Sequence, residues 1–152
     1  MSGVIDYLMA QLPAVMSAVD PDGLVQEGWW TTVTATMLMV GMENPETALT
    51  SDQTRQYLSL GSGRVEEHFL IPAYIDAYVG GNDQSVPRKK VCQIFDGVVD
   101  LVRSDLTLGG NLKAGRFCQV TDVVLIGTRD VEEAKNGRRS VLSFKFDCNN
   151  VY

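Results

Sequence analysis

His68 is the only histidine in the chain, so most acid-base or nucleophilic chemistry would have to be built around it. A Ser-His-Asp or Cys-His arrangement needs a histidine held next to a nucleophile and oriented by a third group. His68 instead follows Glu67 in a segment predicted to be a strand, where adjacent side chains point to opposite faces of the sheet. We therefore predict a half-exposed strand histidine and no catalytic dyad with its neighbour.

The stretch Leu60-Gly61-Ser62-Gly63-Arg64 has the composition of a phosphate-binding loop but not its pattern. It lacks the Lys-Ser/Thr ending of a P-loop, the third glycine of a dinucleotide fingerprint and a following helix that would direct its dipole at a phosphate. Ser62 also does not satisfy the Gly-x-Ser-x-Gly pattern of a nucleophile elbow. The stretch is predicted to be a flexible loop.

Two aspartates, Asp20 and Asp22, begin a segment that resembles the start of a calcium loop. Leu24 stands where a further oxygen ligand belongs, and no glutamate closes a twelve-residue frame. The segment is predicted to be a turn. The pairs Glu66-Glu67 and Glu132-Glu133 are interpreted as solvated surface charge, which is the usual environment of such residues.

The cysteines Cys92, Cys118 and Cys148 are odd in number, far apart in the sequence and without a close His or Cys partner. They are predicted to be reduced and mostly buried thiols. No catalytic, cofactor-binding or metal-binding residue is assigned, and the chain is predicted not to be an enzyme. A small ligand-binding or enzymatic module around His68, Ser62 or Cys92 remains an alternative.

Composition limits the classes of partner. The chain has 152 residues, 45% of them hydrophobic, which suits one domain with its own core. The formal net charge of -6 argues against tight DNA or RNA binding, because that affinity comes largely from Lys and Arg. No apolar run reaches the roughly 18 to 20 residues that cross a bilayer, and the first residues lack a basic signal-peptide region. The expectation is a protein made and used in a cytosol, without a membrane partner.

Apolar periodicity and turn residues predict six elements. In chain order they are helix 3–18, strand 29–40, strand 64–79, helix 85–104, strand 116–128 and strand 138–149. A long loop at about 43–63, with a short helical turn near 56–58, separates the first two strands. Residues 130–137 join the last two strands as a hairpin.

Two prolines bear on these elements. Pro13 lies inside the first helix and is expected to kink or split it, because proline removes a helical hydrogen bond and clashes with the preceding turn. Pro72 lies inside the second strand and is expected to place that strand at an edge or in a bulge, because it cannot donate to a ladder.

The pattern is clearest in the later elements. Helix 85–104 has Pro87 in its first turn, Ser85 or Asp83 as its predicted cap, and a stripe of apolar residues at helical spacing. The stripe consists of Val91, Ile94, Phe95, Val98, Leu101 and Val102. In the last strand, Leu142, Phe144, Phe146 and Cys148 are predicted to share one face, opposite Ser143, Lys145 and Asp147.

The order helix-strand-strand-helix-strand-strand predicts an α+β fold with an antiparallel or mixed sheet of about four strands and both helices on one face. We find no internal repeat and no linker, so residues 1–152 are expected to form a single domain. Trp29 and Trp30 are adjacent in a predicted strand, so one is expected to face the core and the other solvent or a partner. The favoured interpretation of the apolar ridge formed by Met37, Met39 and Met42 is that these side chains pack in the core.

Several stretches, together with the order of the elements, resemble the tail terminator proteins of long-tailed bacteriophages, especially those of actinobacterial hosts. The resembling stretches are Met37 to Gly41 running into Glu43-Asn44-Pro45, Gln56 to Gly61, Arg64 to Pro72, Pro87 to Gly110, and Ser143 to Cys148. None of them is a catalytic signature, and together they span nearly the whole chain.

The resemblance implies a six-membered ring in the virion, at the head-proximal end of the tail tube, assembled in the host cytoplasm. Such a ring stops tube growth and contacts both the tube protein and the head completion (stopper) protein, while DNA passes through its lumen without specific binding. The candidate interface residues are Trp29, Trp30, Arg64, Arg138 and Arg139. A head-to-tail stopper or another neck protein is the alternative within the same class.

Overall fold

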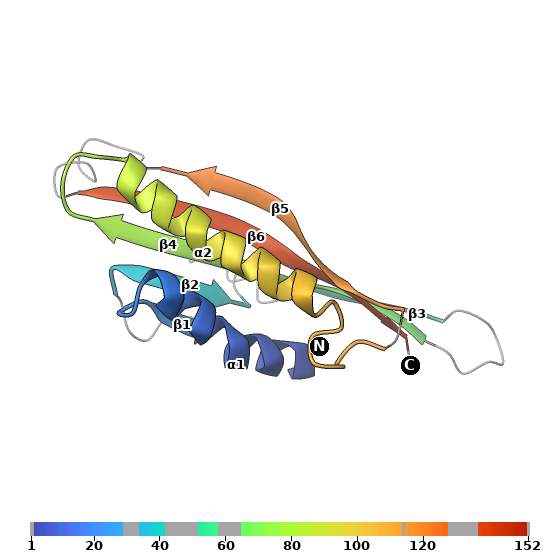
Figure 1. Cartoon of the computed structure of the whole chain (residues 1–152). Helices are drawn as coiled ribbons and strands as arrows, with labels where there is room; N and C mark the ends of the chain where they lie inside the picture. The colour runs from blue at the N-terminus through green and yellow to red at the C-terminus, as the bar shows by residue number, and fades with distance from the viewer. Residues whose placement is uncertain are drawn as a thin grey trace.

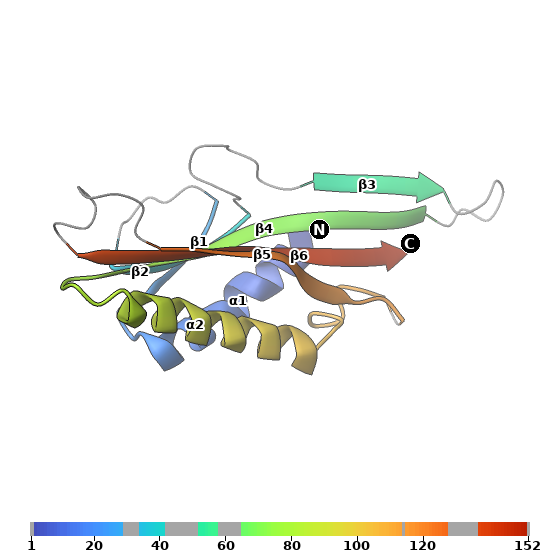
Figure 2. The ribbon, with the colours of Figure 1, turned by 90° about the horizontal axis from the view of Figure 1, so that it is seen from above.

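The computed structural model describes residues 2–28, 34–41, 65–113, 115–127 and 137–151, together with the backbone of 52–57. Two helices and six strands lie within these ranges (Figure 1). In chain order they are α1 (Ser2–Val19), β1 (Leu24–Glu27), β2 (Thr36–Val40), β3 (Asp52–Tyr57), β4 (Val65–Val79), α2 (Ser85–Ser104), β5 (Cys118–Ile126) and β6 (Arg138–Val151). Figure 2 shows α1 and α2 on the same side of the sheet. The predicted α+β fold with two helices on one face is confirmed.

The sheet is mixed and has the strand order β1-β2-β4-β6-β5, with β3 also paired to β4. β1 and β2 are parallel, and all other pairs are antiparallel. The long strand β4 pairs with β6 from Glu66 opposite Val151 to Val79 opposite Arg138, which is all of β4 except its first residue. Its other side pairs first with β3 and then with β2. β4 and β6 therefore form the centre of the sheet.

Pro72 lies in this central strand, so the prediction that it marks an edge or a bulge is wrong. It pairs with Lys145 of β6, and on its other side its carbonyl accepts a hydrogen bond from the Gly41 N–H at 2.7 Å. Gly41 directly follows the last residue of β2, and the β3 register resumes at Leu70. The N–H that proline lacks therefore falls in the gap between two partner strands, where no ladder bond is lost.

Helix α1 runs through Pro13 as one helix of 18 residues, so of the predicted kink or split the split does not occur. Its buried side chains recur at four-residue spacing: Val4, Leu8, Leu12 and Met16. The exposed side of α1 carries Pro13, which leaves that buried row unbroken. By length and composition alone α1 could cross a membrane, but the core helix of a soluble protein meets the same criteria.

The core lies between the helices and the sheet, and its residues follow the predicted periodicities. Helix α2 buries Val91, Ile94, Val98 and Val102, while Phe95 and Leu101 pack partly buried against the core. Strand β6 alternates as predicted, with Leu142, Phe144, Phe146 and Cys148 buried. Asp83 accepts a hydrogen bond from the Ser85 N–H at 2.8 Å, although Gln84 is the residue at the cap position.

Two strands were not predicted. β1 begins directly after the turn at Asp20 to Gly23 and is only four residues long. β3 lies where a loop and a helical turn were predicted, and its sequence Asp-Gln-Thr-Arg-Gln-Tyr has no apolar alternation. Backbone pairing with the long β4 holds it in place, and local sequence patterns do not report such pairing. Of the predicted strand 29–40 the structure describes the part that forms β2, and residues 29–33 lie outside the described residues.

Asp20 ties the end of α1 to β2 and α2. Its Oδ2 accepts hydrogen bonds from Thr36 Oγ1 at 2.5 Å and from Lys90 Nζ at 2.9 Å. These bonds, first that of Thr36 and then that of Lys90, hold the pKa of the Asp20 carboxyl below its ordinary value. A depressed pKa in the folded state stabilises the fold above the unfolded-state pKa, and this contribution is lost as pH falls through the folded-state pKa.

We therefore expect Asp20→Asn to lower the free energy of unfolding at pH 7 by about 1.5–3 kcal/mol, the usual range for hydrogen bonds to a charged group. The difference from wild type is expected to shrink as pH falls below about 4, the ordinary pKa of an aspartate, and to be lost as pH falls through the lowered pKa of the folded Asp20 carboxyl. Urea unfolding across this pH range measures both effects. The exposed Asp22→Asn in the same turn serves as the control, and a difference that did not change with pH would contradict the role of the Asp20 charge.

Candidate assembly surface

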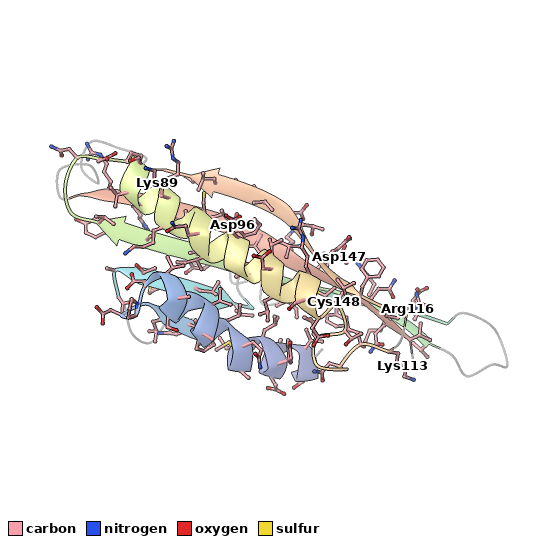
Figure 3. All side chains as sticks on the ribbon, in the orientation of Figure 1. Lys89, Asp96, Lys113, Arg116, Asp147 and Cys148 are labelled. Carbon is pink, nitrogen blue, oxygen red and sulfur yellow. The ribbon has the colours of Figure 1, made fainter. Side chains whose placement is uncertain are left out.

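The face of the sheet turned away from the helices carries a row of polar and charged side chains, which we call the polar face. It comprises Glu66, His68 and Asp76 of β4, Gln119 and Asp122 of β5, Arg139, Lys145 and Asp147 of β6, and Arg116 just before β5. Alternation along β4 and β6 places these residues opposite the buried apolar ones. Figure 3 labels Arg116 and Asp147 toward the end of the sheet where the C-terminus lies.

His68 takes part in a hydrogen-bonded group on this face. Its Nε2 lies 2.6 Å from Asp147 Oδ1, and Gln119 Nε2 donates to Asp147 Oδ2 at 3.1 Å. The side chain of His68 is 47% exposed, so the imidazole lies at an open surface and not in a cleft. This matches the predicted half-exposed strand histidine. The Asp147 carboxylate is shared between His68 and Gln119, so the three side chains form a hydrogen-bonded network at the surface.

Ion pairs connect neighbouring strands across the rest of the polar face. Arg116 Nη1 lies 3.1 Å from Glu66 Oε1, and Lys145 Nζ lies 3.1 Å from Asp122 Oδ2. Arg139 forms a bidentate pair with Asp76 through its Nε and Nη2, with Nε 2.9 Å from Oδ1. Because the carboxylate of Asp76 is 7% exposed, this arginine compensates a charge that would otherwise be buried.

The polar face therefore presents nearly balanced charge. Each of its three cations, Arg116, Arg139 and Lys145, is engaged with a carboxylate of the same chain. Phosphate binding depends on cations that can exchange their counterions for phosphate. A surface whose cations are already paired offers little of this affinity.

A small apolar patch lies within the same side of the sheet. Met37 and Met39 of β2 are 6% and 0% exposed and cluster with Tyr74, which is 2% exposed. Burial, together with the nearby Asp76 carboxylate, raises the pKa of Tyr74 to about 12. The prediction of core packing for Met37 and Met39 is confirmed, and Met42 lies outside the described residues.

The second surface feature is the free edge of the sheet at β5. Among the described residues β5 pairs with no strand other than β6, and on its outer side the Cys118 N–H at its start donates to the Leu106 carbonyl at 3.0 Å. Three consecutive apolar residues, Val123, Val124 and Leu125, are 49%, 51% and 45% exposed. The register shifts between Thr121 and Val124, and Asp122 at this bulge has φ 53°. An exposed apolar edge strand is the kind of structure that pairs with another chain.

The predicted interface residues are only partly described. Arg138 and Arg139 begin β6, where the Arg138 guanidinium donates to the Gly137 carbonyl at 3.1 Å. Arg139 is committed to Asp76, as given above. Trp29, Trp30 and Arg64 lie outside the described residues. The exposed apolar edge was missed, although three successive apolar residues in one strand cannot all face a single core.

The structure describes only some of the other candidates for chemistry. Glu66 and Glu67 do split across β4, but Glu67 is 1% exposed, so the interpretation of this residue as solvated charge is wrong. Alternation along β4 puts Glu67 on the helix-covered face, the same face as Phe69 and Ile71. Glu132-Glu133 and Ser62 lie outside the described residues. Within the part of the chain that is described, no group of His, Cys, Asp and Glu residues could hold a metal ion.

An open groove of about 550 Å³ runs between the two helices. It is lined by Ala14, Val15, Ala18, Val19, Gln93, Asp96, Gly97 and Asp100. Figure 3 shows Asp96 on the outward side of α2. Neither His68 nor Cys92 lines this groove, so it gives no support to a ligand-binding or enzymatic module built around those residues.

These features define a class: an α+β domain with a charge-balanced sheet face and an open apolar edge strand. A similar fold occurs in a chain of a solved structure described as "Virion of native gene transfer agent (GTA) particle". The TM-score is 0.50 at 15% sequence identity, over 97% of this chain and 92% of that one. No protein-family model matches the sequence, and no curated protein matches it. At this identity the likeness concerns the fold, and it extends over nearly the whole of both chains.

Proposed function

We propose that this chain is a structural protein of a phage-like virion, and more specifically a tail terminator. In this role, copies of the chain form a closed ring, with six members as the resemblance implies, at the head-proximal end of the tail tube. The ring stops tube growth and offers its other side to the head completion protein. The observation that carries the proposal is the fold likeness to a virion chain over 97% of the sequence.

The surface features support an assembly role. A ring built from one kind of subunit repeats a single heterologous contact, which needs two different patches on each copy. The open β5 edge with Val123, Val124 and Leu125 is one such patch. The opposite edge of the sheet, where β1 and β3 lie, is a different surface that could contact the β5 edge of a neighbouring copy. Extending a sheet from copy to copy satisfies backbone groups that an edge leaves free.

The charge distribution suits a lumen through which DNA moves. DNA that binds its channel would be retained, because each phosphate neutralised by a free Lys or Arg adds affinity. The polar face has its cations in pairs with carboxylates, and the chain as a whole has a formal net charge of -6. A ring that turned this face inward would let DNA pass with little specific binding.

The test of this function uses Val124→Lys, which places a charge at the open edge. The side chain of Val124 is 51% exposed, so the fold is expected to lose less than about 0.5 kcal/mol of stability. Association, by contrast, is expected to weaken, because a lysine at an edge strand opposes pairing with another strand. Native mass spectrometry, with the protein alone and with the tube protein of the same phage, measures the distribution of oligomers.

The matched control is Val86→Lys, an exposed valine in the first turn of α2 and therefore outside the sheet. We expect the control to assemble like wild type and the edge variant to shift toward monomer. A wild-type chain that stayed monomeric with and without tube protein would refute the ring. Rings that formed equally well with Val124→Lys would keep the ring but exclude this edge as its contact.

A further inference from the structure

Two of the three cysteines face each other across the β5–β6 pair. Cys118 and Cys148 are direct register partners. The Asn149 N–H donates to the Phe117 carbonyl at 3.3 Å, a bond that flanks the pair and identifies it as a non-hydrogen-bonded pair of the antiparallel ladder. Cα atoms in such pairs lie about 4.5 Å apart, within the range of roughly 4.4–6.8 Å that disulfides span.

Both side chains point to the same face. Cys118 is 1% exposed and Cys148 is 0% exposed, and both belong to the core beneath the helices. The neighbouring Cys118 thiol and burial both raise the pKa of the Cys148 thiol. Cys92 has a different setting, because it lies on α2 and is only partly buried.

We propose that Cys118 and Cys148 are a modification site: a dithiol that a small peroxide converts to a disulfide between β5 and β6. In the first step the Cys118 sulfur attacks one oxygen of hydrogen peroxide, which forms a sulfenic acid and releases water. In the second step the Cys148 sulfur attacks the sulfenic sulfur, the S–S bond forms and a second water leaves. Two thiols and one peroxide thus give one disulfide and two waters.

The position of the two residues explains the order of the steps. Cys118 begins the edge strand β5 and is bonded on its outer side to the loop after α2, where its N–H donates to the Leu106 carbonyl at 3.0 Å, whereas Cys148 lies in β6 between the two strands β4 and β5. A small oxidant therefore reaches Cys118 first when the edge strand opens locally. Cys148 is the register partner of Cys118 on the same buried face and so is placed to resolve the intermediate. Figure 3 shows Cys148 next to Asp147 near the end of β6.

The consequence of the bond is a fixed edge strand. The disulfide would close a loop that begins at Cys118 and ends at Cys148, and cross-links of this kind restrict the unfolded chain more than the folded one. It would hold the beginning of β5 against β6 and so secure the strand that carries Val123, Val124 and Leu125. The inference rests on the register and burial alone and does not depend on the proposed function.

The experiment treats the folded, purified chain with a small excess of hydrogen peroxide at mildly alkaline pH, followed by an acid quench and intact-mass analysis. We expect the mass to fall by two hydrogens and the number of reactive thiols to fall from three to one. Peptide mapping without reduction is expected to recover Cys118 linked to Cys148, with Cys92 still open to alkylation. The oxidised form is expected to melt at a higher temperature, and dithiothreitol to reverse the change.

Two variants sharpen the result. Cys92→Ser is expected to close like wild type, and Cys118→Ser to show no loss of two hydrogens. The wild-type measurement decides the matter even if a variant fails to fold. Three persistent thiols, a disulfide that includes Cys92, or products that contain only added oxygen would overturn the site. An oxidised form that melts no higher than the reduced one would overturn its role in fixing the edge.

Discussion

If the chain acts as the proposed tail terminator, a phage that lacks it is expected to produce heads and tails that do not join, with some tails longer than normal. The physical reason is that a tube end presents the same repeated surfaces after every added layer, and contacts of this kind can propagate without limit. Only a different protein bound at the end stops growth. Electron microscopy of lysates from an amber mutant measures both the lengths of the tails and their attachment to heads.

The same images separate the terminator from the stopper. A stopper mutant is expected to give tails of normal length beside heads that have lost their DNA, because tube growth is already terminated. Supplying the wild-type protein from a plasmid is the control, and it is expected to restore joined particles. Uniform tails of normal length that carry a complete head-proximal ring in the mutant would refute the terminator assignment.

Removing the ring of Phe144 is expected to cause the largest loss of stability of any single substitution discussed, about 3–5 kcal/mol. Phe144 is 2% exposed on β6. Its ring packs edge-to-face against Phe95 of α2, with centroids 5.3 Å apart, and against Phe146 at the same distance. Phe144→Ala therefore leaves a cavity where α2 rests on the sheet, and it also removes two aromatic contacts.

Phe117→Ala is the matched control, since Phe117 has the same side chain but is 48% exposed. Its cost is expected to be below about 0.5 kcal/mol. Urea unfolding monitored by circular dichroism gives both free energies. For a chain of this size, the Phe144 variant is expected to melt roughly 6–20 °C lower, given about 2–4 °C per kcal/mol. Equal losses for the two variants would contradict the placement of Phe144 in the core.

The elements with a strong apolar period were predictable from sequence. α2 begins and ends where it was predicted, at residues 85 and 104, because its apolar stripe and its turn signals agree. The alternation of β6 likewise identified which of its side chains enter the core. In both cases the information lies within a few turns or residues of the chain, so local reasoning finds it.

The remaining errors share a physical cause. β3 has no apolar alternation, a proline such as Pro72 usually marks an edge strand, and a glutamate such as Glu67 usually lies at the surface. The environment of all three is set by distant parts of the chain. The length of β4 explains two of them. A strand of 15 residues accepts β3 and β2 in succession on one side, and its proline falls in the gap between them.

The sequence by itself therefore determined the fold class, the helix-covered core and the absence of a recognisable catalytic pattern. These follow from periodicity, composition and motif spacing, which are properties of neighbouring residues. Only the tertiary structure decided which strand forms the open edge, how the charges of the polar face are paired, and that Cys118 meets Cys148. Those facts depend on strand order and register, which are set when segments far apart in the chain pack against one another.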